Sequence, residues 1–300
     1  MQGFLQFVHG WLSRRVNKRV LLGAGSLLES LAGGLTALSA PFPQVVATRV
    51  AAGVGSSTMH PVGVALMMEG AGRNLRGRLI GTFSSLGNIG SLAAPLLVGL
   101  ALTQISWRAT LLLISIPSLL VGLLLLFLFR TKGETPPAEA GSAVREWGVL
   151  IRDRSLMALT GTTVLARVYS LGTYFPAFFL LGLGLDLPTA TLLFLVFRLG
   201  RVPGPYLFGL LSDRTGRKPM MILSLLASST LLYVMTVVSS DLLALGAVVA
   251  TMGITSAAAN VIIQAHIVDS TPPSFRGPVL GIYFTLSEGW GPYGRRCWVS

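Results

Sequence analysis

The 300-residue chain is 52% hydrophobic and 11% charged, with a mean hydropathy of +0.71. Because a soluble domain carries about 25% charged residues, this composition excludes an ordinary soluble protein and indicates a polytopic membrane protein. The net charge of +12 does not indicate nucleic-acid binding, since the basic residues neither form a patch nor alternate with aromatic residues. One cysteine, Cys297, excludes an internal disulfide framework, and three scattered histidines do not form a metal motif.

Eight apolar runs are long enough to cross a bilayer, which takes about 20 helical residues because backbone polar groups must be satisfied internally in hydrocarbon. They lie at residues 20–40, 44–68, 79–102, 109–129, 156–182, 188–210, 219–240 and 242–266. Residues 1–10 read as the tail of an earlier helix, and residues 278–294 as a helix that is cut short. The predicted fold class is therefore all-α, a polytopic membrane protein with eight complete and two partial spans.

The basic residues fix the orientation of these spans. Most of the 23 Lys and Arg residues fall in alternate connections, which are therefore cytoplasmic by the positive-inside rule. The longest of these connections mixes both charge signs with Gly and Pro, as a polar linker does. We therefore predict an N-terminal helical bundle at residues 1–130, a cytoplasmic linker at 131–155 and a C-terminal bundle at 156–300.

Three sets of residues repeat along the chain. They are residues 10–19 with 209–218 at an offset of 199, and residues 76–81 with 276–281 and Gly53 with Gly253 at an offset of 200. A period this long does not fit a solenoid and indicates a duplicated helical bundle.

The charged stretch Gly209-Leu-Leu-Ser-Asp213-Arg214-Thr-Gly216-Arg217-Lys218 separates two apolar runs. We expect one helix to end near Gly209 and the next to begin at Pro219, because proline fits the first turn of a helix. The pattern resembles the loop signature of the major facilitator superfamily of transporters. That resemblance implies two bundles related by an axis along the membrane normal.

The resemblance also assigns roles within this stretch. It makes Gly209, Asp213, Arg214, Gly216 and Arg217 a gating loop that locks and releases the inner ends of the helices. A plain topology anchor would need the positive charges but not the aspartate. In the first copy of the motif Arg14 replaces this aspartate, which puts a symmetrical pair of charge gates in doubt.

On the family's plan of six helices plus six, the chain begins at the end of the second helix and stops inside the eleventh. We therefore expect an incomplete transporter that lacks the first helix, most of the second and the twelfth. The closing residues 294–300 place Arg295 and Arg296 where an apolar helix should continue. This favours a truncated or frame-shifted reading, with an unusual genuine terminus as the alternative.

Ionisable residues inside apolar spans are candidates for function, because each costs several kcal/mol in hydrocarbon. The candidate substrate-binding residues are Arg49, Arg167, Arg198 and Asn260. The arginines predict a net positive cavity, and hence an anionic or zwitterionic substrate held by bidentate contacts. Alternatives stay open: Arg49 can snorkel to the interface, Arg167 can pair with Glu288, and Asn260 can bond a neighbouring helix.

The candidate proton-coupling residues are Glu29, His60 and Glu288. His60 precedes Pro61, so it is equally a hydrogen-bonded residue at a proline kink. For Glu29, burial favours the neutral form and pairing with Arg49 the charged form, and the sequence leaves the outcome open.

Two stretches bear on the direction of transport. Residues 53–61 resemble the fourth helix of fosmidomycin-resistance-type effluxers. Residues 90–99 resemble the antiporter signature of drug:proton exchangers, with Ala94 and Val98 in place of two glycines. Both resemblances favour efflux.

The prediction is a secondary transporter that moves a small anionic organic solute or drug by proton-coupled alternating access, with efflux favoured. The alternatives are a proton-symport importer of an organic anion and a non-transporting fragment. An enzyme is not expected, because no nucleophile, acid pair or metal set is clustered. We expect no cofactor beyond the proton gradient, a small-molecule solute and the lipid bilayer as partners, no nucleic acid, and a monomer in the cytoplasmic (plasma) membrane.

Overall fold

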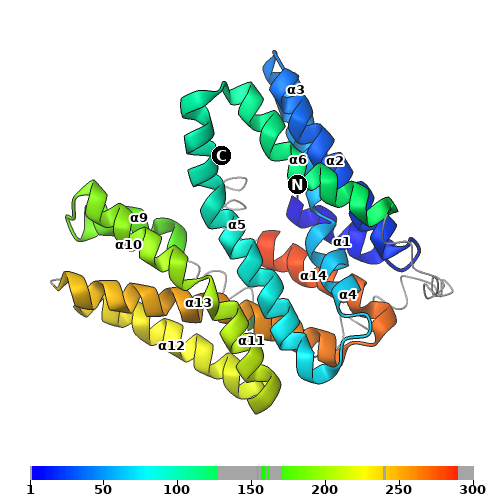
Figure 1. Ribbon diagram of the computed structural model, residues 1–300. Helices are drawn as coiled ribbons and strands as arrows, with labels where there is room; N and C mark the ends of the chain where they lie inside the picture. Colours follow the sequence, from blue (N-terminus) through cyan, green and yellow to red (C-terminus); the bar gives the residue numbers. More distant parts are fainter. Residues whose placement is uncertain are drawn as a thin grey trace. The chain divides into compact units, whose positions relative to one another are not determined.

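The computed structural model describes residues 2–127, 154, 157–159, 161–162, 171–238 and 241–289. Within these ranges every regular element is a helix (Figure 1). The chain forms two compact units: unit 1 comprises residues 1–70, 96–161 and 270–300, and unit 2 comprises residues 71–95 and 162–269. The predicted linker lies almost entirely outside the described residues, so the division at 131–155 stays a prediction.

Five helical segments are long and apolar enough to cross a membrane. They are α2 (Lys18–Leu38), Arg73–Gln104, which contains α5 (Arg76–Gln104), α6 (Trp107–Phe127), α12 (Arg217–Val237) and α13 (Leu242–Ser270). Each coincides with a predicted span to within a few residues, so these five spans are confirmed as apolar helices of spanning length.

The predicted span at residues 44–68 is two helices, α3 (Phe42–Ser56) and α4 (Met59–Met67). The break follows from Pro61, which has no N–H to donate to the carbonyl of Ser57 four residues earlier. A kink at Pro61 is one of the alternatives that the sequence leaves open, and the structure has a full break at residues 57 and 58.

The predicted span at residues 188–210 is also two helices, α10 (Leu187–Gly200) and α11 (Pro203–Thr215). Pro203 begins the second helix, and Pro205 cannot donate to the carbonyl of Arg201. The predicted span at 156–182 lies mostly outside the described residues. Its described end consists of the short elements η2 (Leu171–Tyr174), α9 (Phe175–Ala177) and η3 (Phe178–Gly182).

In unit 1, α2 packs against both α3 and α6, and α1 (Gln2–Leu12) packs against α14 (Arg276–Gly289) (Figure 1). Hydroxyl groups bond α2 to α6: Ser30 Oγ donates to the carbonyl of Ser115 at 2.7 Å, and Ser118 Oγ donates to the carbonyl of Ser26 at 3.3 Å. Such bonds between helices are expected where lipid supplies no hydrophobic drive for association.

In unit 2, an apolar core packs five helical elements against one another. Its buried members come from η3, α9, α10, α12 and α13, and they are Phe175, Phe179, Ala190, Leu193, Phe197, Met235, Leu245, Val249 and Met252. Glycines bring α10 and α11 against α13: a Cβ on Gly200 would lie 3.2 Å from the Cα of Gly253, and one on Gly204 would lie 3.0 Å from the Cα of Ile254. These contacts set the spacing of the helices.

The duplication seen in the sequence recurs in the helix boundaries. Both α5 and α14 follow a 3-10 turn, η1 (Arg73–Leu75) and η4 (Pro273–Phe275) respectively, and both begin at an arginine 200 positions apart. Both α2 and α12 have 21 residues. The predicted repeat is therefore present in local structure within the described residues.

We predict that Gly204→Ala destabilises the protein, because the new methyl group would press on the backbone of Ile254. Overpacking of this kind costs about 1–3 kcal/mol. Thermal unfolding of the purified chain in detergent measures the change. The matched control is Gly87→Ala in α5, where a Cβ meets nothing within 4 Å. Equal melting temperatures for the two variants would show that the α11–α13 contact is not close.

Candidate functional site

The predicted gating loop is mostly helical. α11 continues through Gly209 and Asp213 to Thr215, the turn is confined to Gly216 with φ of 100°, and α12 begins at Arg217. The expectations that a helix ends near Gly209 and that the next begins at Pro219 were wrong. An apolar run marks the part of a helix in hydrocarbon, whereas the helix itself continues into the polar region. The positive φ explains why glycine occupies position 216.

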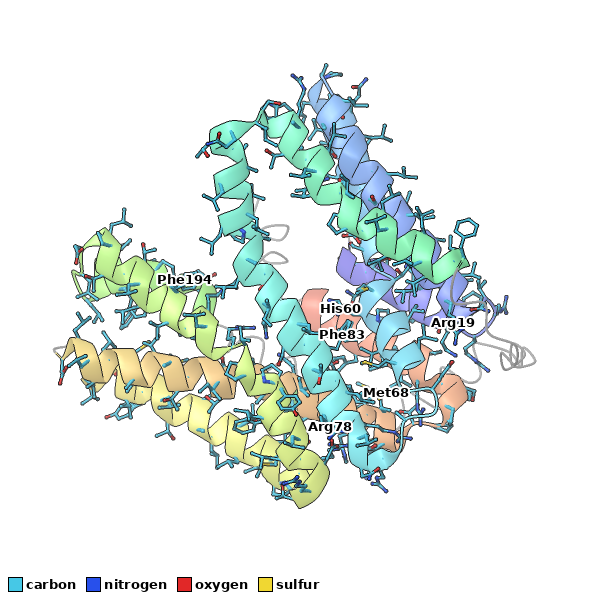
Figure 2. The ribbon with its side chains drawn as sticks, viewed as in Figure 1. Arg19, His60, Met68, Arg78, Phe83 and Phe194 are labelled. Carbon is cyan, nitrogen blue, oxygen red and sulfur yellow. The ribbon has the colours of Figure 1, made fainter. Side chains whose placement is uncertain are left out.

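Asp213 caps the N-terminus of α5. Its Oδ1 accepts the N–H of Gly77 at 2.9 Å, and its Oδ2 accepts the N–H of Arg78 at 2.8 Å. Because α5 begins at Arg76, these first-turn N–H groups have no acceptor within their own helix. The carboxylate satisfies two donors and also meets the positive end of the helix dipole. Figure 2 labels Arg78 at this end of α5.

A chain of buried charges continues from Asp213. Arg217 Nη1 lies 2.6 Å from Asp213 Oδ1, and Arg217 Nε lies 2.9 Å from Asp269 Oδ2. Asp269 Oδ1 in turn accepts from Arg76 Nη1 at 3.0 Å. The side chains of Asp213, Arg217 and Asp269 are only 4%, 9% and 2% exposed. The network therefore joins α5, α11, α12 and α13 at one end of unit 2, and we define it as the charge latch.

The charge latch differs from the predicted gating set in its members. It contains Asp213 and Arg217, whereas Arg214 is exposed. It adds Asp269 and Arg76, which sequence reasoning missed. A signal was present: the acidic residue at the end of an apolar run recurs as Glu69 at an offset of 200. Gly209 contributes through its backbone, since a Cβ on it would lie 2.8 Å from the carbonyl carbon of Gly77.

Arg198 is half-buried on α10 and donates from Nη2 to the carbonyl of Ser91 at 3.1 Å. Pro95, inside α5, cannot donate to that same carbonyl four residues back. The guanidinium therefore replaces the missing backbone donor, as neighbouring helices do for proline in membrane segments.

A reciprocal bond runs from α5 to the α10–α11 break. Asn88 Nδ2 donates to the carbonyl of Arg201 at 2.8 Å, the carbonyl that Pro205 leaves without a backbone donor. These two bonds link α5 to α10, because a side chain from each segment donates to a carbonyl that a proline leaves without a backbone donor in the other.

Among the described residues, no carboxylate forms an ion pair with Arg198. Its bond to Ser91 fixes the orientation of the guanidinium but uses few of its five N–H groups. Elsewhere in unit 2, on α13, Asn260 Oδ1 is buried without a hydrogen-bond partner in the described part of the chain. Both predicted substrate-binding residues therefore retain unused polar capacity.

The unit 1 candidates lie on α2, α3 and α4. Arg49 Nη2 donates to Thr36 Oγ1 at 3.0 Å and so links α3 to α2, the helix that carries Glu29.

Two histidines of unit 1 contact residues outside their own helices. His60 stacks on Phe284, with ring centroids 5.1 Å apart (Figure 2 labels His60). His9, which sequence reasoning missed, has its Nδ1 2.9 Å from Ser57 Oγ and 3.1 Å from the carbonyl of Leu5. Arg167 and the side chain of Glu288 lie outside the described residues.

Comparison with known proteins gives a consistent result. A family model described as Major Facilitator Superfamily matches residues 1–294. The chain is 25% identical over 226 residues to an Escherichia coli (strain K12) protein named "Probable L-galactonate transporter", covering 69% of this chain and 48% of that protein. The chain spans about half the length of the curated relatives that it matches.

Two solved structures share the fold. The proton:xylose symporter XylE has a TM-score of 0.73 at 17% identity, over 96% of this chain and 74% of its own. The human organic anion transporter MFSD10 has a TM-score of 0.75 at 15% identity, over 95% of this chain and 72% of its own.

We predict that Asp269→Asn lowers the free energy of unfolding by about 3 kcal/mol, because it removes the buried carboxylate that Arg76 and Arg217 share. Thermal unfolding in detergent measures this. The control is Glu69→Gln at the equivalent position, where the carboxylate is 46% exposed and pairs with Lys18, so the expected loss is below about 1 kcal/mol. Equal losses at the two sites would contradict the burial of the charge latch.

Proposed function

The chain belongs to the major facilitator superfamily, and from that premise we propose that it transports a small organic anion by proton-coupled alternating access. Family membership and the helices of spanning length make it a multi-pass membrane protein of the transporter class rather than an enzyme. The anionic solute, the coupling to protons and the direction are our proposal.

Arg198 is the observation that carries the anionic solute. It lies about 16 Å from the start of α10 at Leu187, measured along the helix axis. A membrane span built from α10 and α11 therefore holds it well inside hydrocarbon. A cation there is costly unless it has a function or a partner, and no described carboxylate pairs with it. A planar guanidinium binds a carboxylate through two parallel N–H donors. The bond to Ser91 would hold it oriented for that contact.

A hydroxylated carboxylic acid fits the remaining polar group. The buried Oδ1 of Asn260 needs a donor, and a solute hydroxyl can supply one. The relative in Escherichia coli is named "Probable L-galactonate transporter", and L-galactonate combines one carboxylate with several hydroxyl groups. We therefore propose a sugar acid or a similar hydroxy acid as the solute class.

Glu29 is the proposed proton carrier. It lies within the apolar helix α2 at the contact with α3, since a Cβ on Gly55 would lie 3.0 Å from the Cα of Glu29. Gain or loss of its proton would therefore change the charge at this contact. His60 and Glu288 remain further candidates for coupling. Efflux rests on the antiporter-like run at residues 90–99, and proton symport into the cell is the alternative. A monomer in the cytoplasmic membrane remains a prediction.

We predict that Arg198→Gln abolishes transport of radiolabelled L-galactonate in membrane vesicles from cells that express the chain. Glutamine keeps an N–H donor for the carbonyl of Ser91 but removes the charge. Arg198→Lys should retain part of the activity, since it keeps the charge and loses the bidentate geometry.

Lys218→Gln is the matched control, because this lysine is exposed in the first turn of α12, lies outside the predicted gating set and should not contact the solute. Excess unlabelled galactose, which lacks the carboxylate, should compete poorly. Full transport by Arg198→Gln would refute the anion site. Uptake by inside-out vesicles that requires an acidic vesicle interior would support efflux. Uptake only by right-side-out vesicles would support import.

A further inference from the structure

Two helix N-termini occupy equivalent places in the duplicated chain. α5 begins at Arg76 beside α11, and α14 begins at Arg276 beside α1. The repeat offsets pair Asp213 with Arg14 and Arg78 with Pro278. Both members of the Asp213–Arg78 hydrogen bond are therefore different in the other copy.

The changes at positions 14 and 278 are complementary. In unit 2, Asp213 accepts from the N–H groups of Gly77 and Arg78. In unit 1, Pro278 stands in the first turn of α14, where it has no N–H to offer. Arg14 has no acceptor to offer, and its guanidinium carbon lies 4.4 Å above the ring of Phe275. Position 14 therefore lacks the carboxylate acceptor of Asp213, and position 278 lacks the N–H donor of Arg78.

The other latch positions follow the same contrast. Arg76 bonds the carboxylate of Asp269, whereas its counterpart Arg276, only 7% exposed, donates from Nη1 to the carbonyl of Met68 at 3.1 Å. Figure 2 labels Met68 just beyond α4. The counterpart carboxylate, Glu69, pairs instead with Lys18 and is 46% exposed. The contacts of Arg276 and Glu69 therefore differ from those of Arg76 and Asp269.

Close backbone contact is the feature that both copies keep. A Cβ on Gly10 would lie 2.5 Å from the carbonyl oxygen of Gly277 and 2.9 Å from the Cα of Gly281. In unit 2, a Cβ on Gly77 would lie 2.5 Å from the carbonyl oxygen of Gly209. The helices therefore approach closely in both units, and the residues at the helix start are what differs.

We infer that Arg14 and Pro278 form a compensated pair, in which the copy that lost the carboxylate acceptor has also lost the N–H donor. Just after α1, Arg14 stacks on Phe275 beside the start of α14, whereas on α11 the carboxylate of Asp213 caps the start of α5. Arginine at position 14 with a normal N–H at 278 would set a cation against the positive end of α14. Aspartate at 14 with Pro278 would lack one of its two donors. The inference does not rest on the proposed solute or on transport.

A double-mutant cycle tests the pair. The melting temperatures of wild type, Arg14→Asp, Pro278→Ala and the double variant are measured on the purified chain in detergent. Pro278→Ala should raise the melting temperature of Arg14→Asp by about 2–4 °C more than it changes that of wild type, because it supplies a charge-assisted hydrogen bond. Additive effects of the two changes would overturn the inference.

A matched cycle at the charge latch provides the control. Arg78→Pro should lower the melting temperature of wild type more than that of Asp213→Asn, since in the second background the carboxylate is already gone. If Arg14→Asp does not fold, Arg14→Asn supplies a neutral acceptor, and Pro278→Ala should still show positive coupling with it. Failure of both double variants to fold, with Pro278→Ala alone folding, would also overturn the compensated pair. Neither cycle uses solute, so loss of transport cannot be confused with this result.

Discussion

Hydrocarbon supplies no hydrogen-bond partner, so every carbonyl that a proline leaves without its backbone donor must be satisfied by another part of the protein. This constraint explains the two bonds between α5 and α10. Pro95 releases the carbonyl of Ser91, which Arg198 satisfies, and Pro205 releases the carbonyl of Arg201, which Asn88 satisfies. Pro95 lies within the unbroken helix α5 and Pro205 follows the break between α10 and α11, and each freed carbonyl is bonded by a side chain of the other segment. These two prolines are consequently sites of tertiary contact.

The same scarcity of partners governs the buried charges. Asp269 is 2% exposed, and a lone carboxylate in that place would cost several kcal/mol. Arg76 and Arg217 bond its oxygens, Arg73 Nε lies 3.9 Å from its Oδ2, and Arg217 also pairs with Asp213, so each charge has at least one opposite neighbour. The network therefore stabilises one arrangement of four helices.

Much of this arrangement is legible in the sequence because it depends on side-chain hydropathy and local motif. Five spans, the repeat and the family follow from apolar runs and from the charged stretch around Asp213. The break between α10 and α11 was missed, since Pro205 acts through an absent N–H group that hydropathy does not record, whereas a kink at Pro61 was among the alternatives that the sequence left open. The contact of Arg198 with Ser91 joins positions 107 residues apart. In the sequence, Asp269 is a single acidic residue at the end of an apolar run, and nothing beside it indicates its partners. Such pairings emerge only when the helices are packed.

The helix boundaries also record where the duplicated halves were free to diverge in length. α2 and α12 begin and end 199 positions apart, whereas α3 and α13 begin 200 apart. The extra residue of the second half therefore lies in the connection between α12 and α13. Inside a helix, one added residue would rotate everything beyond it by about 100° and exchange its lipid-facing and buried sides. Insertion in the connection leaves both faces in register, so length can vary there without disturbing the contacts that membrane burial demands.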